Sequence, residues 1–290
     1  MHLTVVHDDF QEDRIANLLC ALGSSSVLDI SGCRLSEFLL NNGFYFDQAT
    51  SIFRVRDNNF KVAPNALLLS RVVDVSPQTV SRILGEGSGL FKGQVLWALQ
   101  SASARYRNVC STNGLYSSVG TVLPLPTQWA IFDEMNLPGI TPKYIYSYGS
   151  GIFDISTFEK PIIKSTYDYY NWKPGKYSDE MFDRFAVEQP SGNPVITYVS
   201  PTHEWHVPLN GSFQVPNELI SKLARGVWDA FGGLLLEILW FVDKESVTFG
   251  CASHYCVSLQ TFDRIDGFVE EFQRLCQRVA ADHDVITNLG

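Results

Sequence analysis

Short apolar runs typical of β-strands alternate along this chain with stretches whose apolar residues recur at helical spacing. Residues 3–6 form an apolar, β-rich run, residues 10–22 repeat apolar side chains at helical spacing, and residues 27–30 are strand-like again. A chain that opens in this β-α-β order builds layers of helices and strands. The alternation therefore predicts an α/β fold.

The pattern continues to about residue 120. Hairpin-like segments occupy residues 43–62, residues 66–73 have the composition of a buried strand, and residues 91–107 have the pattern of a helix. Two prolines, at 124 and 126, then interrupt the pattern. We assign residues 1–120 to an N-terminal α/β domain.

A second, strand-rich domain is expected over residues 121–290. It opens with a helix over 127–136, and further helices over 217–231 and near the C-terminus carry apolar stripes, so both of these should lie on a sheet. Strands are expected at 144–148, 161–165, 184–189, 195–199, 203–207, 234–242 and 247–252.

The charge balance bears on the partners of the protein. Among 290 residues, 22 Lys and Arg stand against 31 Asp and Glu, which gives a formal net charge of -9 and argues against binding nucleic acid. No stretch stays apolar for the length of a membrane span, and the start lacks the basic and apolar regions of a signal peptide. We expect a cytoplasmic protein that contacts no membrane.

The six cysteines are scattered without paired spacing, in a chain too large to need disulfide staples. Buried, reduced thiols are therefore expected. Cys251, His254 and Cys256 could present metal ligands, but they lie in a strand-like stretch with no second cluster nearby to complete a tetrahedral site. We predict no metal centre.

Other short motifs favour ordinary structure over catalysis. His203-Glu204-Trp205-His206 falls one residue short of the zinc-protease motif, and in an extended segment its two histidines would point to opposite faces. The glycine-rich run at residues 85–89 follows no clear strand and lacks a Walker lysine, which favours a loop over a phosphate site. Because no serine lies in a G-x-S-x-G context, we predict no catalytic residue.

Aromatic residues make up 13% of the chain, and several gather in the loop-like stretch at residues 165–183. They follow no period of two or 3.6, so a simple assignment to the core is awkward. Immediately before them, Lys164 closes an apolar strand, where it either reaches solvent or contacts an anion.

The order of these elements resembles the ATP-grasp ligases, in particular the microviridin-type (graspetide) branch, which binds a ribosomally made precursor peptide and joins its side chains. The similar segments are residues 5–14 (opening strand and helix), 69–73 (strand carrying arginine), 127–142 (helix and G-x-x-x-P segment), 161–164 (strand with an ATP-contacting lysine), 187–190 (V-Q-E strand) and 231–233 (L-G-L turn). The resemblance implies a pre-ATP-grasp-like α/β domain followed by a truncated ATP-grasp-like α+β domain.

The acidic cluster that this family needs to hold magnesium on the triphosphate is missing from the matching positions. Counting from the turn places Leu239 where the family has Asp, and Glu237 could substitute only if the strand register slips by two. The next strand offers Cys251 and Ser253 in place of Glu-x-Asn. Neither side chain supplies a carboxylate for magnesium.

Further departures fall in the same cleft. The family's earlier lysine corresponds to Thr127 or Gln128, and its arginine after the V-Q-E strand falls near Val195. The span 164–189 is short for the glycine-bearing hairpin that closes over ATP. The resemblance thus implies a pseudoenzyme that keeps the scaffold and uses no cofactor.

What the resemblance leaves is peptide recognition, as in the noncatalytic ATP-grasp-like peptide binders of ribosomal-peptide (RiPP) pathways such as crocagin biosynthesis. The implied partners are the precursor peptide (leader or core), a modifying enzyme of the pathway and, by family habit, a second copy that forms a homodimer. Exposed Tyr and Trp suit a peptide groove, although they could equally pack the loop onto the domain. The expected peptide-binding residues are Tyr167, Tyr169, Tyr170, Trp172, Tyr177, Asp179, Phe182 and Arg184, and the vestigial nucleotide cleft would hold Lys164, Glu188, Gln189 and Glu237.

Rival functions stay open at this point. One is an active ATP-dependent peptide ligase that uses Glu237 and Lys164. Another is an ATP-independent enzyme in which His203, Glu204 or His206 transfers a proton on a bound peptide. A third is a purely structural subunit with no affinity for any precursor peptide.

Overall fold

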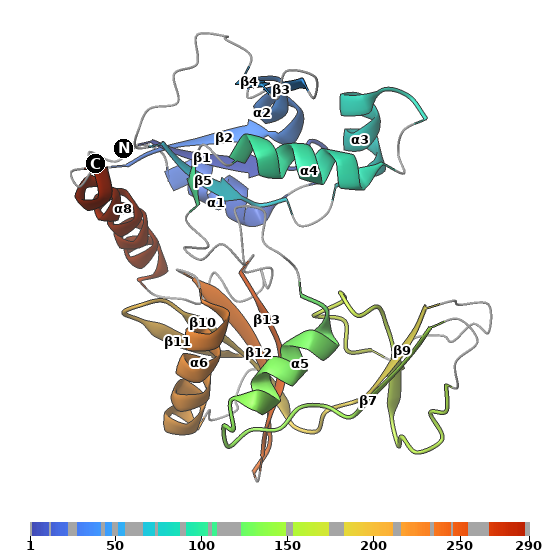
Figure 1. Ribbon diagram of the computed structural model, residues 1–290. Coiled ribbons are helices and arrows are strands. Elements are labelled where there is room, and N and C mark those ends of the chain that lie inside the picture. The colour runs from blue at the N-terminus through green and yellow to red at the C-terminus, as the bar shows by residue number, and fades with distance from the viewer. Residues whose placement is uncertain are drawn as a thin grey trace. The chain divides into compact units, whose positions relative to one another are not determined.

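The chain divides into two compact units. The computed structural model (Figure 1) describes residues 2–11, 13–22, 28–41, 44–47, 52–55, 66–72, 75–87, 91–103, 106–108, 123–148, 153–173, 183–210, 216–232, 235–244, 246–254 and 267–287. The first unit combines Met1–Thr121 with Asp266–Gly290, and the second is Val122–Ile265. The C-terminal segment therefore groups with the N-terminal one, whereas the sequence placed it in the range 121–290.

The first unit is built on a parallel sheet. Strand β1 (His2–His7) pairs with β2 (Asp29–Arg34) on one side and with β5 (Ala66–Ser70) on the other, and β5 pairs with the short β6 (Arg107–Asn108). Helix α1 (Arg14–Leu22) connects β1 to β2. The predicted β-α-β opening is confirmed.

Three further helices complete the layers of the first unit. They are α2 (Leu35–Asn41), α3 (Pro77–Leu84) and α4 (Lys92–Ser103), of which the sequence predicted only the last. Side chains from these helices and from the sheet share one core, which includes Val6, Phe38, Leu68, Val80 and Leu99. The expected hairpin is present as β3 (Phe44–Asp47) paired antiparallel with β4 (Ile52–Val55).

The long C-terminal helix α8 (Phe268–Thr287) contacts β5 and β6 of the same unit. Its apolar stripe is buried at Phe268, Phe272, Leu275 and Cys276. The helix lies on a sheet, as its sequence pattern predicts, and that sheet is the parallel one.

The second unit contains two antiparallel sheets. The larger has the order β11-β10-β12-β13, from β11 (Glu204–Pro208), β10 (Asn193–Val199), β12 (Leu236–Val242) and β13 (Val247–Ser253). The smaller has the order β7-β9-β8, from β7 (Tyr144–Tyr148), β9 (Asp183–Glu188) and β8 (Pro161–Ile163). All these strands were predicted, within a few residues at each end.

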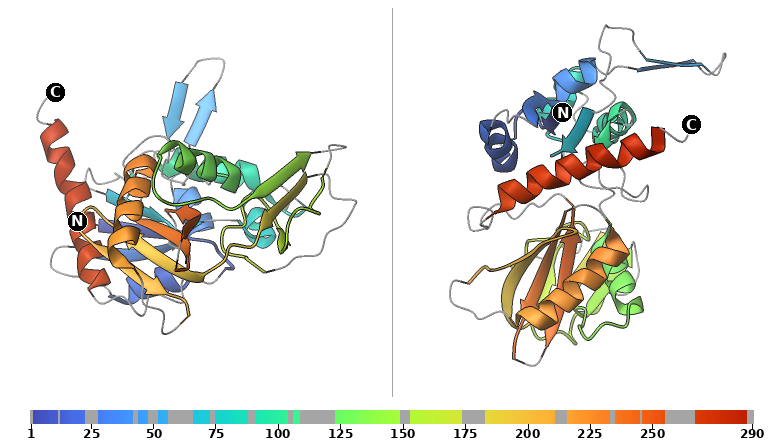
Figure 2. Two further views of the ribbon diagram at one scale, coloured as in Figure 1. Left: turned by 90° about the horizontal axis from the view of Figure 1, so that it is seen from below. Right: turned by 90° about the vertical axis from the view of Figure 1, so that its left-hand side faces the viewer.

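Two helices pack against the larger sheet. Helix α6 (Asn217–Phe231) runs along one face (Figure 2), and α5 (Leu125–Glu134) contacts the edge strand β13. On the α6 side, His206 shares hydrogen bonds with Thr197 of β10 (3.0 Å) and Ser221 of α6 (3.1 Å). Because side chains alternate along a strand, the residues next to Thr197 and His206 in their strands point to the face opposite α6.

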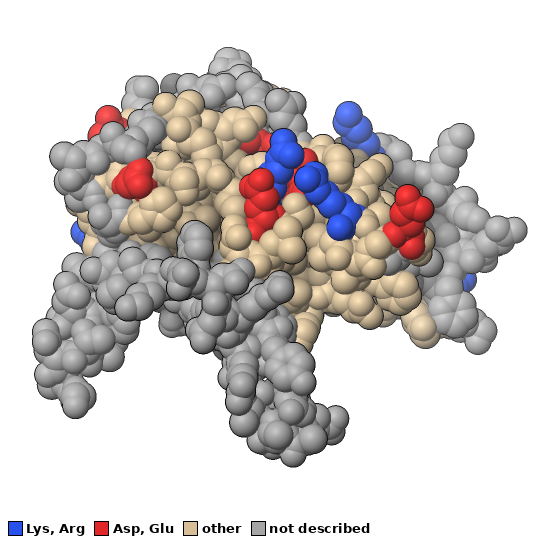
Figure 3. All heavy atoms as spheres, turned by 90° about the horizontal axis from the view of Figure 1, so that it is seen from above, with Lys and Arg blue, Asp and Glu red and all other residues tan. Residues whose placement is uncertain are grey.

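The surface carries charges of both signs. On the face drawn in Figure 3, basic and acidic side chains lie next to one another rather than gathered by sign. Among the residues that the structure describes, no helix combines the length and apolar composition that crossing a bilayer requires.

Candidate functional site

The face of the larger sheet that lies opposite α6 carries Glu237, one of the four residues that the sequence placed in a vestigial nucleotide cleft. We call it the cleft face and define it by Tyr198, Glu237, Leu239, Phe241, Cys251 and Ser253. Glu237 pairs in register with Tyr198 on one side and Ser253 on the other, and Leu239 pairs with Cys251. Cross-strand partners share a face, as do alternate residues of one strand, so these side chains point the same way.

Glu237 is the single acidic side chain that the four strands of this sheet place on the cleft face. It is fully buried. Two residues further along β12 stands Leu239, and facing it is Cys251, whose thiol pKa is raised by burial. A hydrocarbon and a protonated thiol are poor ligands for a hard cation such as magnesium.

An irregularity in β13 sets this register. The pairing of β12 with β13 shifts between Leu239 and Trp240, opposite Gly250. A side chain at Gly250 would approach the Leu239 carbonyl oxygen at 3.0 Å, so the close packing there suits glycine. The shift keeps Cys251 and Ser253 on the cleft face while Phe249 points to the other side.

Helix α5 is anchored to the outer edge of β13. The Trp129 indole N–H donates to the Gly250 carbonyl oxygen (2.9 Å), and the Ala252 N–H donates to Gln128 Oε1 (2.7 Å). The buried Gln128 amide also donates to the Leu123 carbonyl oxygen at 3.0 Å. Thus, one of the two positions assigned to the family's earlier lysine holds a glutamine that ties the helix to the sheet.

Lys164 follows β8 directly, and its backbone N–H donates to the Phe185 carbonyl oxygen (3.2 Å). Its side chain is buried, and within the described residues Nζ has no hydrogen-bond partner. The ammonium instead lies 4.0 Å from the centroid of the Trp172 ring. Burial lowers the pKa of Lys164 to about 8, an effect that the charge of Asp168 partly opposes.

Residues 165–173, which we call the aromatic segment, cover the cleft face. The Tyr170 hydroxyl donates a hydrogen bond to Glu237 Oε1. The Cys251 thiol lies 3.6 Å from the Tyr169 carbonyl oxygen, and the Trp172 ring meets Phe241 edge-on at 4.8 Å between centroids. Lys164 and Glu237 therefore contact the same short segment, at Trp172 and Tyr170.

Glu188 and Gln189 are not brought into this group. Glu188 accepts hydrogen bonds from the backbone N–H groups of Glu159 (2.9 Å) and Lys160 (2.7 Å). The alternation of β9 places it on the face of the smaller sheet opposite to Val187 and its partner Ile162. Gln189 is exposed, so both residues support the turn before β8 from outside the cleft.

The expected peptide-binding residues differ widely in exposure. Tyr167 is 57% exposed, whereas Tyr169 is buried and Tyr170 and Trp172 are half-buried against the cleft face. Arg184 is half-buried, donates to Ser147 Oγ (3.2 Å) and lies 5.5 Å from the centroid of the Phe153 ring. The remaining three, Tyr177, Asp179 and Phe182, lie outside the described residues.

A row of tyrosines on β7 was not singled out from the sequence. Tyr144, Tyr146 and Tyr148 are 42%, 51% and 64% exposed, while Ser147 between them is buried. They lie at alternate positions of an edge strand, and Tyr146 contacts Phe185 of β9 at 6.5 Å between ring centroids. The alternating letters Y-I-Y-S-Y were the signal that could have identified this surface.

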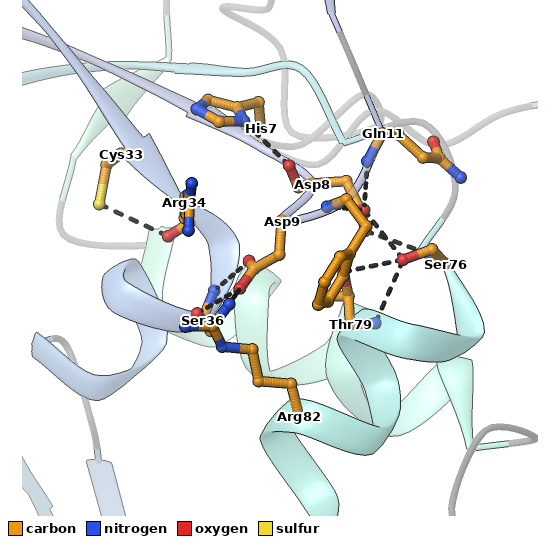
Figure 4. Close-up of polar contacts among 11 residues, drawn as sticks. His7, Asp8, Asp9, Gln11, Cys33, Arg34, Ser36, Ser76, Thr79 and Arg82 are labelled. Carbon is orange, nitrogen blue, oxygen red and sulfur yellow. Dashed lines mark hydrogen bonds and ion pairs between the residues drawn. The ribbon is translucent and has the colours of Figure 1, made fainter.

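A pocket of about 650 Å³ lies in the first unit, where β1 and β5 end. It is lined by Phe10, Pro77, Gln78, Ser81, Arg82 and Glu86, none of which the sequence proposed as a site. Asp9 lies beneath it and reaches Arg82 NH1 at 3.4 Å and the Ser36 N–H at 2.9 Å (Figure 4). The neighbouring Asp8 accepts hydrogen bonds from Ser76 N–H (3.1 Å) and Gln11 N–H (3.0 Å).

The acidic pair below this pocket has a structural explanation. Asp8 fixes Ser76, which caps α3, and Asp9 binds the start of α2. Burial would raise the pKa of Asp8, but hydrogen bonds from the backbone of Phe10 and Ser76 and from nearby hydroxyls lower it below its ordinary value. Gly85, the first residue of the glycine-rich run, ends α3 with its N–H bonded to the Ser81 carbonyl oxygen.

The other motifs are held by ordinary contacts. The segment 203–206 enters strand β11 as predicted, and Glu204 pairs with Arg225 of α6. His254 lies 3.0 Å from the Gly232 carbonyl oxygen, while Cys256 lies outside the described residues. Within the described part of the chain, no group of three or more His, Cys, Asp or Glu side chains is arranged to hold a metal ion.

Comparison with known proteins gives matches in structure only. No protein-family model and no curated protein matches the sequence. D-alanine–D-alanine ligase from Bacillus anthracis complexed with ATP matches with a TM-score of 0.62 at 11% identity, over 98% of this chain and 99% of that chain.

Two further similar structures are complexes with a precursor. The macrocyclase MdnC from Microcystis aeruginosa, bound with its precursor peptide MdnA, has a TM-score of 0.57 at 11% identity, over 97% of this chain and 100% of that chain. The ATP-grasp ligase PsnB complexed with minimal precursor has a TM-score of 0.59 at 12% identity, over 97% and 98%. The predicted fold class is confirmed: along nearly its whole length, this chain has the mixed α/β fold of the ATP-grasp ligases.

Proposed function

We propose that this protein binds the precursor peptide of a RiPP pathway and presents it to a partner enzyme, and that it has lost ATP-grasp catalysis. The composition of the cleft face carries the proposal. Phosphoryl transfer depends on magnesium held by several carboxylate oxygens. Here Glu237 is the one acid on the face, its carboxylate accepts a hydrogen bond from Tyr170, and Leu239 and Cys251 stand beside it.

The peptide part of the proposal is supported by similar structures. MdnC and PsnB were each captured with a precursor peptide, and both match this chain over nearly its full length. A protein that keeps this scaffold can keep the peptide surface even when the nucleotide chemistry is gone, because binding and catalysis use different side chains.

We assign the peptide to the exposed tyrosines of β7, together with Tyr167. Tyr146 and Tyr148 present large, semi-rigid rings that lose little conformational entropy on binding. Strand β7 is also an edge strand, so an extended peptide could pair with its backbone while its side chains meet the tyrosine rows. Arg184, on the other face of the same sheet, would then act on the orientation of β7 through Ser147.

Two titrations of the purified protein test this function. Of synthetic copies of the short open reading frames that neighbour the gene, one should bind with a dissociation constant in the micromolar range, as measured by fluorescence anisotropy, and Tyr146→Ala should weaken that binding about tenfold. Lys222→Ala, on the exposed side of α6, should leave the affinity unchanged.

Mg-ATP supplies the second titration. Calorimetry should detect no saturable binding up to about 1 mM, a limit that corresponds to roughly 4 kcal/mol of binding free energy. Micromolar binding accompanied by phosphate release would overturn the loss of catalysis. Failure of any precursor peptide to bind would leave the structural-subunit rival.

One observation favours an active ATP-dependent ligase as a second candidate. Lys164 and Glu237 both lie on the cleft side and touch the same aromatic segment, so a cation and a carboxylate are available within one site. If Glu237→Gln abolishes formation of a cross-linked peptide product in the presence of Mg-ATP, this candidate replaces the first. The homodimer and the partner enzyme stay predictions.

A further inference from the structure

We propose that the aromatic segment, residues 165–173, is an intramolecular plug that occupies the cleft face and keeps it closed to nucleotide. This inference builds on the proposed function, because it names what holds the vestigial cleft shut. The plug is anchored at two points, Tyr170 on Glu237 and Trp172 between Lys164 and Phe241.

The first anchor compensates a buried acid. Glu237 is 0% exposed, and its cross-strand neighbours on the cleft face, Tyr198 and Ser253, carry no charge. An ionised carboxylate in such surroundings is costly unless hydrogen-bond donors meet it. The Tyr170 hydroxyl is one such donor, and it comes from the segment rather than from the sheet.

The second anchor compensates a buried base. Lys164 is 7% exposed, and within the described residues its Nζ has no hydrogen-bond partner. The Trp172 ring lies 4.0 Å from that atom, and a desolvated ammonium above an indole is among the more favourable cation–π arrangements. Phe241 meets the same indole edge-on, with 4.8 Å between the ring centroids.

The segment is held in shape by its own hydrogen bonds. The Trp172 indole N–H donates to the Tyr169 carbonyl oxygen (2.7 Å), the Asn171 N–H to Asp168 Oδ1 (3.2 Å), and the Asp168 N–H to the Ser165 carbonyl oxygen (3.1 Å). Both anchors therefore come from a preformed turn, which lowers the entropy lost on docking. Because the turn follows Lys164 in the chain, it competes at an effective concentration on the order of millimolar or higher.

The chemistry of a displacing ligand follows from the two anchors. Once the rings are removed, a buried ammonium at Lys164 and a carboxylate at Glu237 are exposed to one space. A ligand with an anionic group for the Lys164 ammonium and a bound cation for the Glu237 carboxylate would pair with both charges. Mg-ATP is the probe of this kind that we choose. Tyr170 and Trp172 are thus placed where they exclude such a ligand.

The test compares wild type with a variant carrying Tyr170→Phe and Trp172→Leu, two changes that preserve most of the buried volume. Calorimetry should detect saturable Mg-ATP binding to the variant at concentrations where wild type shows none, which corresponds to an affinity at least about tenfold higher, since both competing contacts are removed. Lys222→Ala, at an exposed position of α6 on the other side of the sheet, is the control and should change neither measurement.

A second measurement does not depend on nucleotide. Acylation of Lys164 by an amine reagent, followed by mass spectrometry of its peptide, should be at least about tenfold faster in the variant than in wild type. Circular dichroism verifies that the variant is folded. If a folded variant neither binds Mg-ATP more tightly nor acylates faster, there is no plug. If instead wild type itself binds and hydrolyses Mg-ATP, the proposed loss of catalysis is wrong, whatever the comparison of wild type with the variant shows.

Discussion

At the scale of single residues, Lys164 is the side chain with the largest electrostatic consequence. Burial lowers its pKa from 10.5 to about 8 in the folded protein. The unfolded chain therefore holds this proton more firmly than the folded one between about pH 8 and pH 10.5. Below about pH 8 both states are protonated and the full cost of burial is present; the cost is relieved as the pH rises through this window.

Replacement of Lys164 by methionine should accordingly raise stability at neutral pH. We expect a gain at pH 7 of up to about 3 kcal/mol, the free energy that such a pKa difference represents, and a smaller gain at pH 10. Urea unfolding of both proteins at the two pH values measures it. Lys143→Met, at an exposed position, is the control. A Lys164→Met effect that is independent of pH would contradict the assignment.

At the scale of elements, the turn into β10 limits how the larger sheet can form. Gly192 has φ 101°, in the region that L side chains rarely adopt, and an added Cβ would lie 2.5 Å from the Val242 carbonyl carbon. Asn193, the first residue of β10, is paired with Val242 of β12. The glycine therefore lets the chain enter the strand while passing close to its neighbour.

Gly192→Ala should destabilise the protein by about 3 kcal/mol or more, because backbone strain and the clash with Val242 act together. The same substitution at Gly93, in α4 with nothing within 4 Å of its added Cβ, should stabilise by about 0.5–1 kcal/mol through helix propensity. Chemical unfolding of the two variants measures the change in the free energy of unfolding for each. Equal changes would show that the turn tolerates a side chain.

At the scale of the whole molecule, the two ends of the chain belong to one compact unit. Helix α8 contacts β5 and β6, and its buried face includes Phe272 and Leu275. The parallel sheet is thus packed against a helix that follows the whole second unit in the chain, whereas Val122–Ile265 forms a unit by itself.

Phe272→Ala should cost about 3–5 kcal/mol of stability, the usual range for removing a buried ring. Hydrogen exchange with mass spectrometry should then show lost protection in β5, while peptides from β10 and β12 keep theirs. Gln277→Ala, at an exposed position of the same helix, should stay within about 0.5 kcal/mol of wild type. Loss of protection in β12 of equal size would contradict the assignment of α8 to the first unit.

Local patterns predicted most of the elements, but not all. Apart from the short β6, the strands of both units follow from apolar runs, and helices α1, α4, α5, α6 and α8 follow from helical spacing. Helices α2 and α3 were missed because they are short; their positions depend on hydrogen bonds to Asp8 and Asp9, which come from a distant loop. Short helices gain most of their stability from such tertiary contacts.

The candidate site divides in the same way. The resemblance to the ATP-grasp ligases placed Leu239, Cys251 and Ser253 where that family has magnesium-binding residues, and the sequence itself showed that aromatic residues gather after Lys164. Whether those aromatics face solvent or the sheet depended on the fold: Tyr170 and Glu237 meet across 67 residues of sequence. Residue types and periodicity depend only on near neighbours in the chain. The sequence by itself therefore determined most of the strands and helices, and the lack of acidic residues at the positions that match the family's magnesium site. Only tertiary packing, which sets strand register and brings distant segments together, decided that the aromatic segment covers the cleft and that the tyrosines of β7 remain exposed.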